Sequence, residues 1–273
     1  MFTDFHELNP QQIAALVLEY LEDTLFSSNK ELEQVLAVAI SGSVASGHYD
    51  QFSDIDLDFY CMEDSGVDRY QEVLLDFKKK TLAQSNTPLQ IHRLKSMSKM
   101  ANELSSYQDD NALREISQSV TVLDPQGHFS ALQKNFIWYP EDVATEKLQW
   151  LYAQLVFEYN ERYRIALVRD DLYYIRVSML EILRLAGNAL LVANKKWPAF
   201  DKHLYASLKS AGCDTNIMSK FDNALAANNN GLAASAGELV KSVEEYLVGQ
   251  DLIPQETTKY WIDLRPAFSV NLG

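Results

Sequence analysis

The sequence predicts an α+β protein in which a small mixed-sheet domain, residues 1–139, is followed by an α-helical bundle domain, residues 140–273. Short apolar runs alternate with helical segments over the first half of the chain. The last of these runs ends in Asp124-Pro125-Gln126-Gly127, which is typical of a turn. From residue 141 to 195 there is no proline and a single glycine, and apolar residues recur at helical spacing.

The elements of the first domain follow from this periodicity. Asn9-Pro10 begins a helix predicted over residues 10–26, because asparagine and proline favour the start of a helix. The apolar run 35–41 predicts a buried strand, and residues 55–61 predict its neighbour. The remaining predictions are a helix over 67–84, a strand over 88–94, a broken helix over 97–117 and a strand over 119–123.

Long helices are predicted for the second domain. One apolar stripe runs from Tyr152 to Tyr163 and another from Leu172 to Leu190. Tyr173 and Tyr174 could stack on an aromatic ligand, but tyrosine at helical spacing is more often part of a core. We therefore expect both tyrosines to be core residues. A cleft between two domains is a common place for a ligand.

The composition limits the classes of function. The chain has 273 residues and a net charge of −14, with a pI near 4.8. Nucleic-acid binding requires cations that neutralise phosphates, so a polyanion is not expected as the main partner. A cationic small molecule fits the negative field, although simple solubility explains the charge equally well. An oligomer is compatible with the sequence but is not required by it.

No segment is long and apolar enough to cross a membrane, and the acidic N-terminus does not resemble a secretory signal. The two cysteines, Cys61 and Cys213, lie in apolar surroundings without a metal-binding or redox spacing. We expect them to be free thiols in the core of a cytoplasmic protein.

The most informative stretch is Gly42-Ser43, followed after ten residues by Asp54-Ile55-Asp56. Two carboxylates spaced i, i+2 on a strand point to the same face. At about 4 Å they would repel by about 4 kcal/mol at an effective dielectric of about 20. A hard divalent cation is the usual way to offset such repulsion. The Gly-Ser turn offers backbone N–H groups and a hydroxyl to a phosphate, so the stretch predicts metal-assisted chemistry on a nucleoside triphosphate.

These residues resemble the signature of the DNA polymerase β-like nucleotidyltransferase superfamily. The short α/β domain and the helical domain look like its small-molecule branch, which includes aminoglycoside and lincosamide nucleotidyltransferases. Three stretches carry the finer similarity, the last of them more loosely: residues 53–59, residues 122–127, and residues 169–174 through 197–202.

The resemblance implies transfer of a nucleoside monophosphate, with ATP as the favoured donor, to a hydroxyl of a small molecule, with antibiotics among the acceptors considered. It implies that Asp54 and Asp56 hold Mg²⁺, with two ions expected. It also implies that Gly42 and Ser43 bind phosphate. Lys202 would contact the nucleotide from the helical domain, although a solvated lysine is the alternative.

One departure from the family pattern concerns a third carboxylate, which the family often supplies from the third strand. Residues 88–94 contain no acid, and Gln90 or His92 lies where that carboxylate is expected. Asp58 shares the face of Asp54 and Asp56 by period two, about 7 Å beyond Asp56, and is a candidate catalytic acid. Glu103 and Asp124 are further candidates. The departure leaves open two alternatives: a nucleotide-binding regulatory protein with weak or no catalysis, and a nucleotidyltransferase that acts on a protein or an RNA end.

Overall fold

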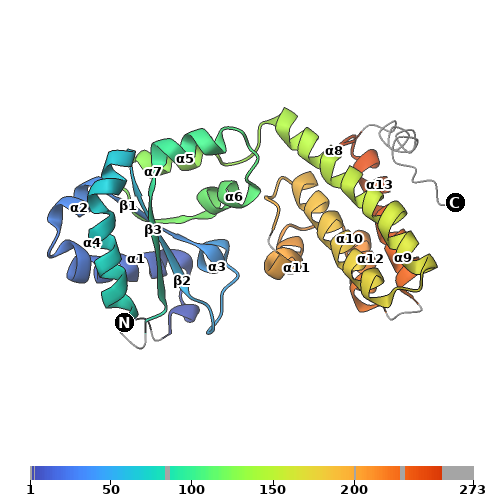
Figure 1. The fold of residues 1–273 in the computed structure, drawn as a ribbon, viewed down its shortest axis with the longest axis horizontal. Helices are drawn as coiled ribbons and strands as arrows, with labels where there is room; N and C mark the ends of the chain where they lie inside the picture. The colour runs from blue at the N-terminus through green and yellow to red at the C-terminus, as the bar shows by residue number, and fades with distance from the viewer. Residues whose placement is uncertain (1, 3, 84–86, 200, 228–230, 254–273) are drawn as a thin grey trace. The chain divides into compact units, whose positions relative to one another are not determined.

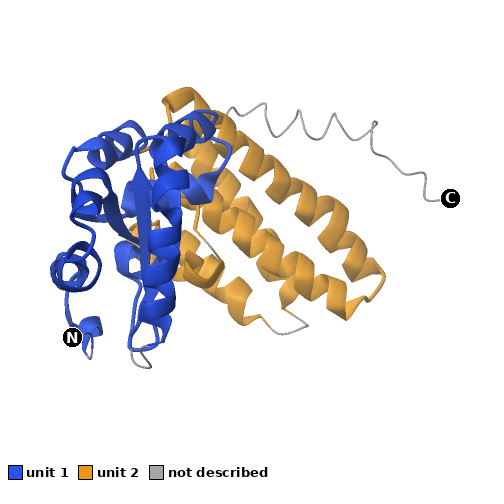
Figure 2. Ribbon diagram, turned by 60° about the vertical axis from the view of Figure 1, so that its left-hand side comes forward, with its two compact units in different colours: residues 1–137 blue, residues 138–273 orange. Residues whose placement is uncertain are grey.

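The computed structural model describes residues 2, 4–83, 87–199, 201–227 and 231–253. The chain divides into two compact units, Met1–Ile137 and Trp138–Gly273, coloured separately in Figure 2. The division lies close to residue 139, where the sequence predicts the end of the first domain.

Unit 1 is built on a four-stranded sheet of β1 (Ala37–Ser41), β2 (Ile55–Cys61), β3 (Leu89–Ser96) and β4 (Val120–Leu123), shown in Figure 1. The strand order is β3-β2-β1-β4. Strand β1 pairs antiparallel with β2 and β4, whereas β2 and β3 are parallel. The sheet is therefore mixed, and together with the helical second unit it confirms the predicted α+β class.

The first helix shows how local sequence sets an element. Asn9 accepts a hydrogen bond from the backbone N–H of Gln12, and the Gln12 side chain accepts one from the backbone N–H of Asn9. This reciprocal cap starts α1 (Pro10–Leu21), which continues into the π-helix η2 (Glu22–Phe26). The other helices of the unit are α2 (Lys30–Val35), α3 (Gly42–Ser46), α4 (Asp64–Leu82), α5 (Met97–Leu104), α6 (Asp110–Gln118) and α7 (His128–Asn135), with the short η1 (Phe5–Glu7) before α1.

The sheet has two chemically different faces. One face packs against α1 and α4, and the Tyr20 and Phe77 rings of these helices lie 6.2 Å apart between centroids. The strands contribute alternate apolar side chains to this core, namely Val38, Ile40, Ile55, Leu57, Phe59, Leu89 and Ile91. Because side chains alternate along a strand, Ser41, Asp56, Asp58 and Tyr60 belong to the opposite face. There the Tyr60 ring packs on Phe129 of α7, with centroids 4.7 Å apart.

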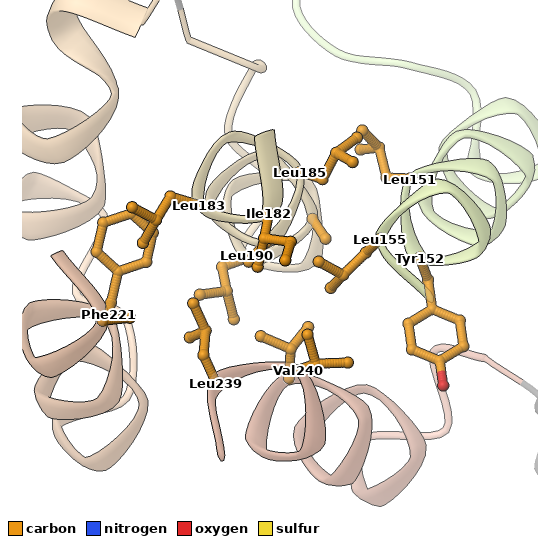
Figure 3. Close-up of a cluster of buried hydrophobic side chains, with 14 of the residues drawn as sticks. Leu151, Tyr152, Leu155, Ile182, Leu183, Leu185, Leu190, Phe221, Leu239 and Val240 are labelled. Atoms are coloured by element: carbon orange, nitrogen blue, oxygen red, sulfur yellow. The ribbon is translucent and has the colours of Figure 1, made fainter. Parts of the chain in front are cut away.

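Unit 2 is a helical bundle with α10 (Leu172–Ala193) at its centre. Figure 3 shows Ile182, Leu183 and Leu190 of α10 packed among side chains from three neighbouring helices. These neighbours are α8 (Glu141–Phe157), α12 (Thr215–Ala226) and α13 (Leu232–Gly249). The unit also contains the π-helix η3 (Glu158–Tyr163), α9 (Arg164–Val168) and α11 (Asp201–Ser210).

The expectation that Tyr173 is a core residue is wrong, because its side chain is 80% exposed. It lies in the first turn of α10, on the side that faces away from the bundle, whereas Tyr174 packs partly against the core. Cys61 and Cys213 are free and buried, as predicted. Among the described residues, no helix combines the length and apolarity that a membrane crossing requires.

Candidate active site

The two acids of the predicted metal site lie where β2 begins. Asp54 directly precedes the strand and is exposed, while Asp56 belongs to it and has a side chain 18% exposed. Ser41, the last residue of β1, pairs with Asp56 across the antiparallel ladder. The end of β1 therefore delivers the following Gly42-Ser43 turn directly beside the acids.

Gly42 is held against Asp56 so closely that no side chain fits. Its φ is +67°, a conformation that favours glycine, and a Cβ there would lie 2.1 Å from Asp56 Oδ2. Ser43 follows in the first turn of α3 and is partly exposed. The structure thus brings together four of the predicted site residues, Gly42, Ser43, Asp54 and Asp56, at one edge of the sheet.

Gln90 of β3 bridges the two acids. The parallel register pairs Gln90 with Asp56. With the amide oriented as its surroundings require, its nitrogen donates to Asp54 Oδ2 at 2.7 Å and to Asp56 Oδ1 at 2.8 Å. The two carboxylate oxygens therefore lie within the reach of a single amide group, which directly places the acids as neighbours.

Asp58 lies on the same face but is completely buried. Its carboxylate accepts a hydrogen bond from the Ser41 hydroxyl at 2.6 Å and contacts Lys95 Nζ at 2.7 Å and His92 Nδ1 at 3.2 Å. Burial raises the pKa of Asp58, but the hydrogen bond from His92 and the charge of Lys95 outweigh burial and lower that pKa from 3.8 to about 2. Asp58 is thus an enclosed anion rather than an acid that faces solvent.

His92 connects the buried acid to the site. Its Nδ1 contacts Asp58 and its Nε2 lies 3.2 Å from Asp56 Oδ1. Hydrogen bonds to Asp56 and Asp58 raise the pKa of His92 from 6.5 to about 10, against the opposing effect of burial. The imidazole is therefore cationic at neutral pH in this arrangement and holds Asp56 in place through a second contact.

Lys95 was not singled out by the sequence, and an irregularity in β3 explains why. Leu57 pairs with Ile91 and Phe59 pairs with Leu94, so β3 carries one extra residue at this point. Strict alternation from Ile91 would turn Lys95 toward the apolar core. The extra residue instead places Lys95 on the acid face, where its Nζ also contacts Glu115 Oε1 of α6 at 2.7 Å. In the sequence, Lys95 follows His92 by three residues, a spacing that puts the two side chains on one face of a strand only if the strand carries an extra residue.

The remaining predicted residues lie elsewhere. The Asp124 carboxylate accepts hydrogen bonds from the backbone N–H and the hydroxyl of Ser130 at 2.9 and 2.7 Å, so it stabilises the start of α7. Glu103 is exposed on α5, 4.0 Å from Lys99. Lys202 is exposed near the start of α11 in unit 2, and its contact with a nucleotide stays a prediction.

Asp54 and Asp56 are the carboxylates that this site would offer to a divalent cation. Within the described ranges, no group of three or more His, Cys, Asp or Glu side chains is arranged to hold a metal ion. Asp54 and Asp56 nevertheless each present one oxygen to a shared point, which the Gln90 amide group contacts at 2.7 and 2.8 Å. Carboxylate and amide oxygens are the ligands that hard cations prefer. The residues therefore fit a magnesium ion, provided that another oxygen completes the pair.

Part of the chain is similar to a family model, and most of it is similar to a solved structure. Residues 106–204 match a family model described as a domain of unknown function (DUF4037), which covers less than half of the chain and excludes Gly42, Asp54 and Asp56. A search of curated proteins finds no match. The crystal structure of a nucleotidyltransferase-like protein from Exiguobacterium sibiricum 255-15 is similar, with 12% identity and a TM-score of 0.49 over 86% of this chain and 78% of that one. Neither similarity assigns a chemistry to this chain.

Proposed function

We propose that the protein is a Mg²⁺-dependent nucleotidyltransferase. It would transfer a nucleoside monophosphate, with AMP favoured, from a nucleoside triphosphate to a hydroxyl of a small molecule. The observation that carries the proposal is the fit of Gly42 against Asp56, with Asp54 beside it. This fit supports the proposal, because the Gly42-Ser43 turn lies directly beside the two acids and would let a phosphate and a cation bind next to each other.

Each group of the chain has a role in this scheme. Asp54 and Asp56 would hold magnesium, which supplies positive charge to the phosphate oxygens when it is bound. The backbone at Gly42 and the Ser43 hydroxyl would bind the phosphates, because a turn without a side chain allows close approach. His92 and Asp58 would fix the orientation of Asp56 through the contacts described above.

The charge of the protein favours a small acceptor. A net charge of −14 repels a polyanion, whereas it attracts a cationic molecule that carries hydroxyl groups. We therefore propose a small hydroxylated acceptor, cationic aminoglycoside-like molecules among those to be tried first, rather than an RNA end.

The test is a pair of substitutions at the acids, Asp54→Asn and Asp56→Asn. Pyrophosphate release is measured with ATP, Mg²⁺ and a panel of hydroxylated acceptors, and we expect a loss of about 100-fold or more. Asp68→Asn serves as the matched control, because Asp68 is exposed on α4 away from the acids and loses the same charge. Full turnover by both acid variants would refute the assignment.

A second candidate is a nucleotide-binding regulatory protein with little chemistry. It is favoured by the enclosure of Asp58, whose carboxylate is occupied by Ser41, His92 and Lys95 and so is withdrawn from catalysis. Calorimetry with ATP and Mg²⁺ distinguishes the two. Tight binding without pyrophosphate release for any acceptor would favour the regulatory function.

A further inference from the structure

Gln90 is a neutral side chain that contacts both Asp54, which is exposed, and Asp56, which is mostly buried. Its amide contacts Asp54 Oδ2 at 2.7 Å and Asp56 Oδ1 at 2.8 Å. We propose that Gln90 supplies the third oxygen of the cation site, and that its amide turns over when the ion binds. This inference rests on the proposed function, because it requires a divalent cation at Asp54 and Asp56.

Without a bound cation, the amide nitrogen of Gln90 holds the carboxylates of Asp54 and Asp56 next to each other. An amide carries two hydrogens, and Gln90 donates one to each carboxylate. Two carboxylates this close repel each other, and hydrogen bonds to charged acceptors offset part of that repulsion. Because Leu89 and Ile91 on either side are buried in the core, the backbone of β3 holds the amide at this position.

The same amide is suited to the metal-bound state after a half-turn about its last carbon–carbon bond. The oxygen and nitrogen of an amide are nearly equal in size, so this rotation brings the carbonyl oxygen to the place that the nitrogen held. Three oxygens then converge, which is a donor set that a hard cation accepts. With the nitrogen inward, its hydrogens would instead oppose a cation.

The other polar groups on this face are already committed. Asp58 is enclosed by Ser41, His92 and Lys95, and the two ring nitrogens of His92 contact two different acids. Among the described residues, Gln90 is the side chain that contacts both Asp54 and Asp56 and also carries an oxygen. That oxygen can take the place of the amide nitrogen. The amide oxygen of Gln90 would therefore take the place of the third carboxylate that the third strand lacks.

The test compares Gln90→Glu and Gln90→Leu in the full chain. Affinity is measured for Mg²⁺ by calorimetry and for Mn²⁺ by electron paramagnetic resonance, both with a non-hydrolysable ATP analogue present. We expect Gln90→Glu to bind the ions at least about tenfold more tightly and Gln90→Leu about tenfold more weakly. Gln90→Glu should also melt at a lower temperature than wild type in EDTA and regain stability with Mg²⁺.

Gln11→Glu is the matched control, because Gln11 is exposed on α1 and gains the same charge away from the acids. If wild type binds the ions but both Gln90 variants match its affinity, the assignment of Gln90 is overturned while the proposed function stands. If wild type binds no ion with nucleotide present, the proposed function itself fails.

A measurement on the wild-type protein does not depend on how the variants fold. The side-chain NH₂ resonances of Gln90 can be followed in protein labelled with ¹⁵N-glutamine, and are identified by their absence from the Gln90→Leu spectrum or by their proximity to bound Mn²⁺. We expect these resonances to shift when Mg²⁺ binds, since the nitrogen leaves the carboxylates. Unshifted resonances at saturating Mg²⁺ would overturn the proposal.

Discussion

Replacing Gly42 by alanine should separate the geometry of the site from the stability of the fold. The new Cβ would lie 2.1 Å from Asp56 Oδ2, whereas an ordinary contact begins at 3.4 Å. Asp56 must therefore move by about 1 Å, which weakens its contacts with Gln90 and His92. A displacement of about 1 Å in a reacting site costs about 100-fold in rate. The positive φ of Gly42 adds a backbone cost of about 1 kcal/mol or more.

Gly47→Ala is the matched control for this prediction. Gly47 also has a positive φ, +74°, but a Cβ there meets nothing within 4 Å. Both variants should lose a similar backbone contribution to the free energy of unfolding, measured by urea denaturation. Only Gly42→Ala should lose Mg²⁺ affinity in calorimetry and pyrophosphate release with ATP. If Gly42→Ala binds Mg²⁺ as tightly as Gly47→Ala, the close fit of Gly42 and Asp56 has no functional role.

Three further outcomes are expected. Lys95→Met should lower the free energy of unfolding by about 3 kcal/mol, because Asp58 stays buried without its ammonium partner. The depressed pKa of Asp58 stabilises the protein above pH 3.8, and this contribution is lost as the pH falls toward 2. The acid-unfolding midpoint of Lys95→Met should therefore move to higher pH, and an unchanged midpoint would contradict the described network. Burial raises the pKa of Cys61 to about 11 and also raises that of Cys213, so mass spectrometry should find neither alkylated by iodoacetamide near neutral pH until the chain unfolds. Asp214→Ala should cost about 1 kcal/mol in urea denaturation, since Asp214 caps α12, and Asp214→Ser should recover most of it.

The parts of the fold that depend on local pattern were predictable. The apolar run and its flanking turn predict β2 at residues 55–61, which is where the strand lies. Asn9-Pro10 predicts the start of the first helix for a reason that the structure shows, the reciprocal cap with Gln12. Gly42, Ser43, Asp54 and Asp56 are close in sequence, so one turn between two strands is enough to gather them.

The parts that depend on pairing across the sheet were not predictable. Lys95 reaches Asp58 only because β3 carries an extra residue, and nothing in the period of its apolar residues marks that position. The partners of the buried Asp58 likewise lie on other strands, Ser41 on β1 and His92 and Lys95 on β3. Tyr173 lies on the outward face of α10 with the exposed Val177 and Leu180, although Tyr174 beside it packs against the core.

The contact between Gly42 and Asp56 has a consequence for how this chain can change. Two positions fourteen residues apart behave as one, because any side chain at the first collides with the carboxylate of the second. In an Asp56→Ala background that collision is removed, so a methyl group at position 42 then costs only the backbone strain of its positive φ. The two positions are therefore coupled in evolution: a side chain at position 42 costs less once the carboxylate at position 56 is lost, and the carboxylate can be kept only while position 42 stays glycine.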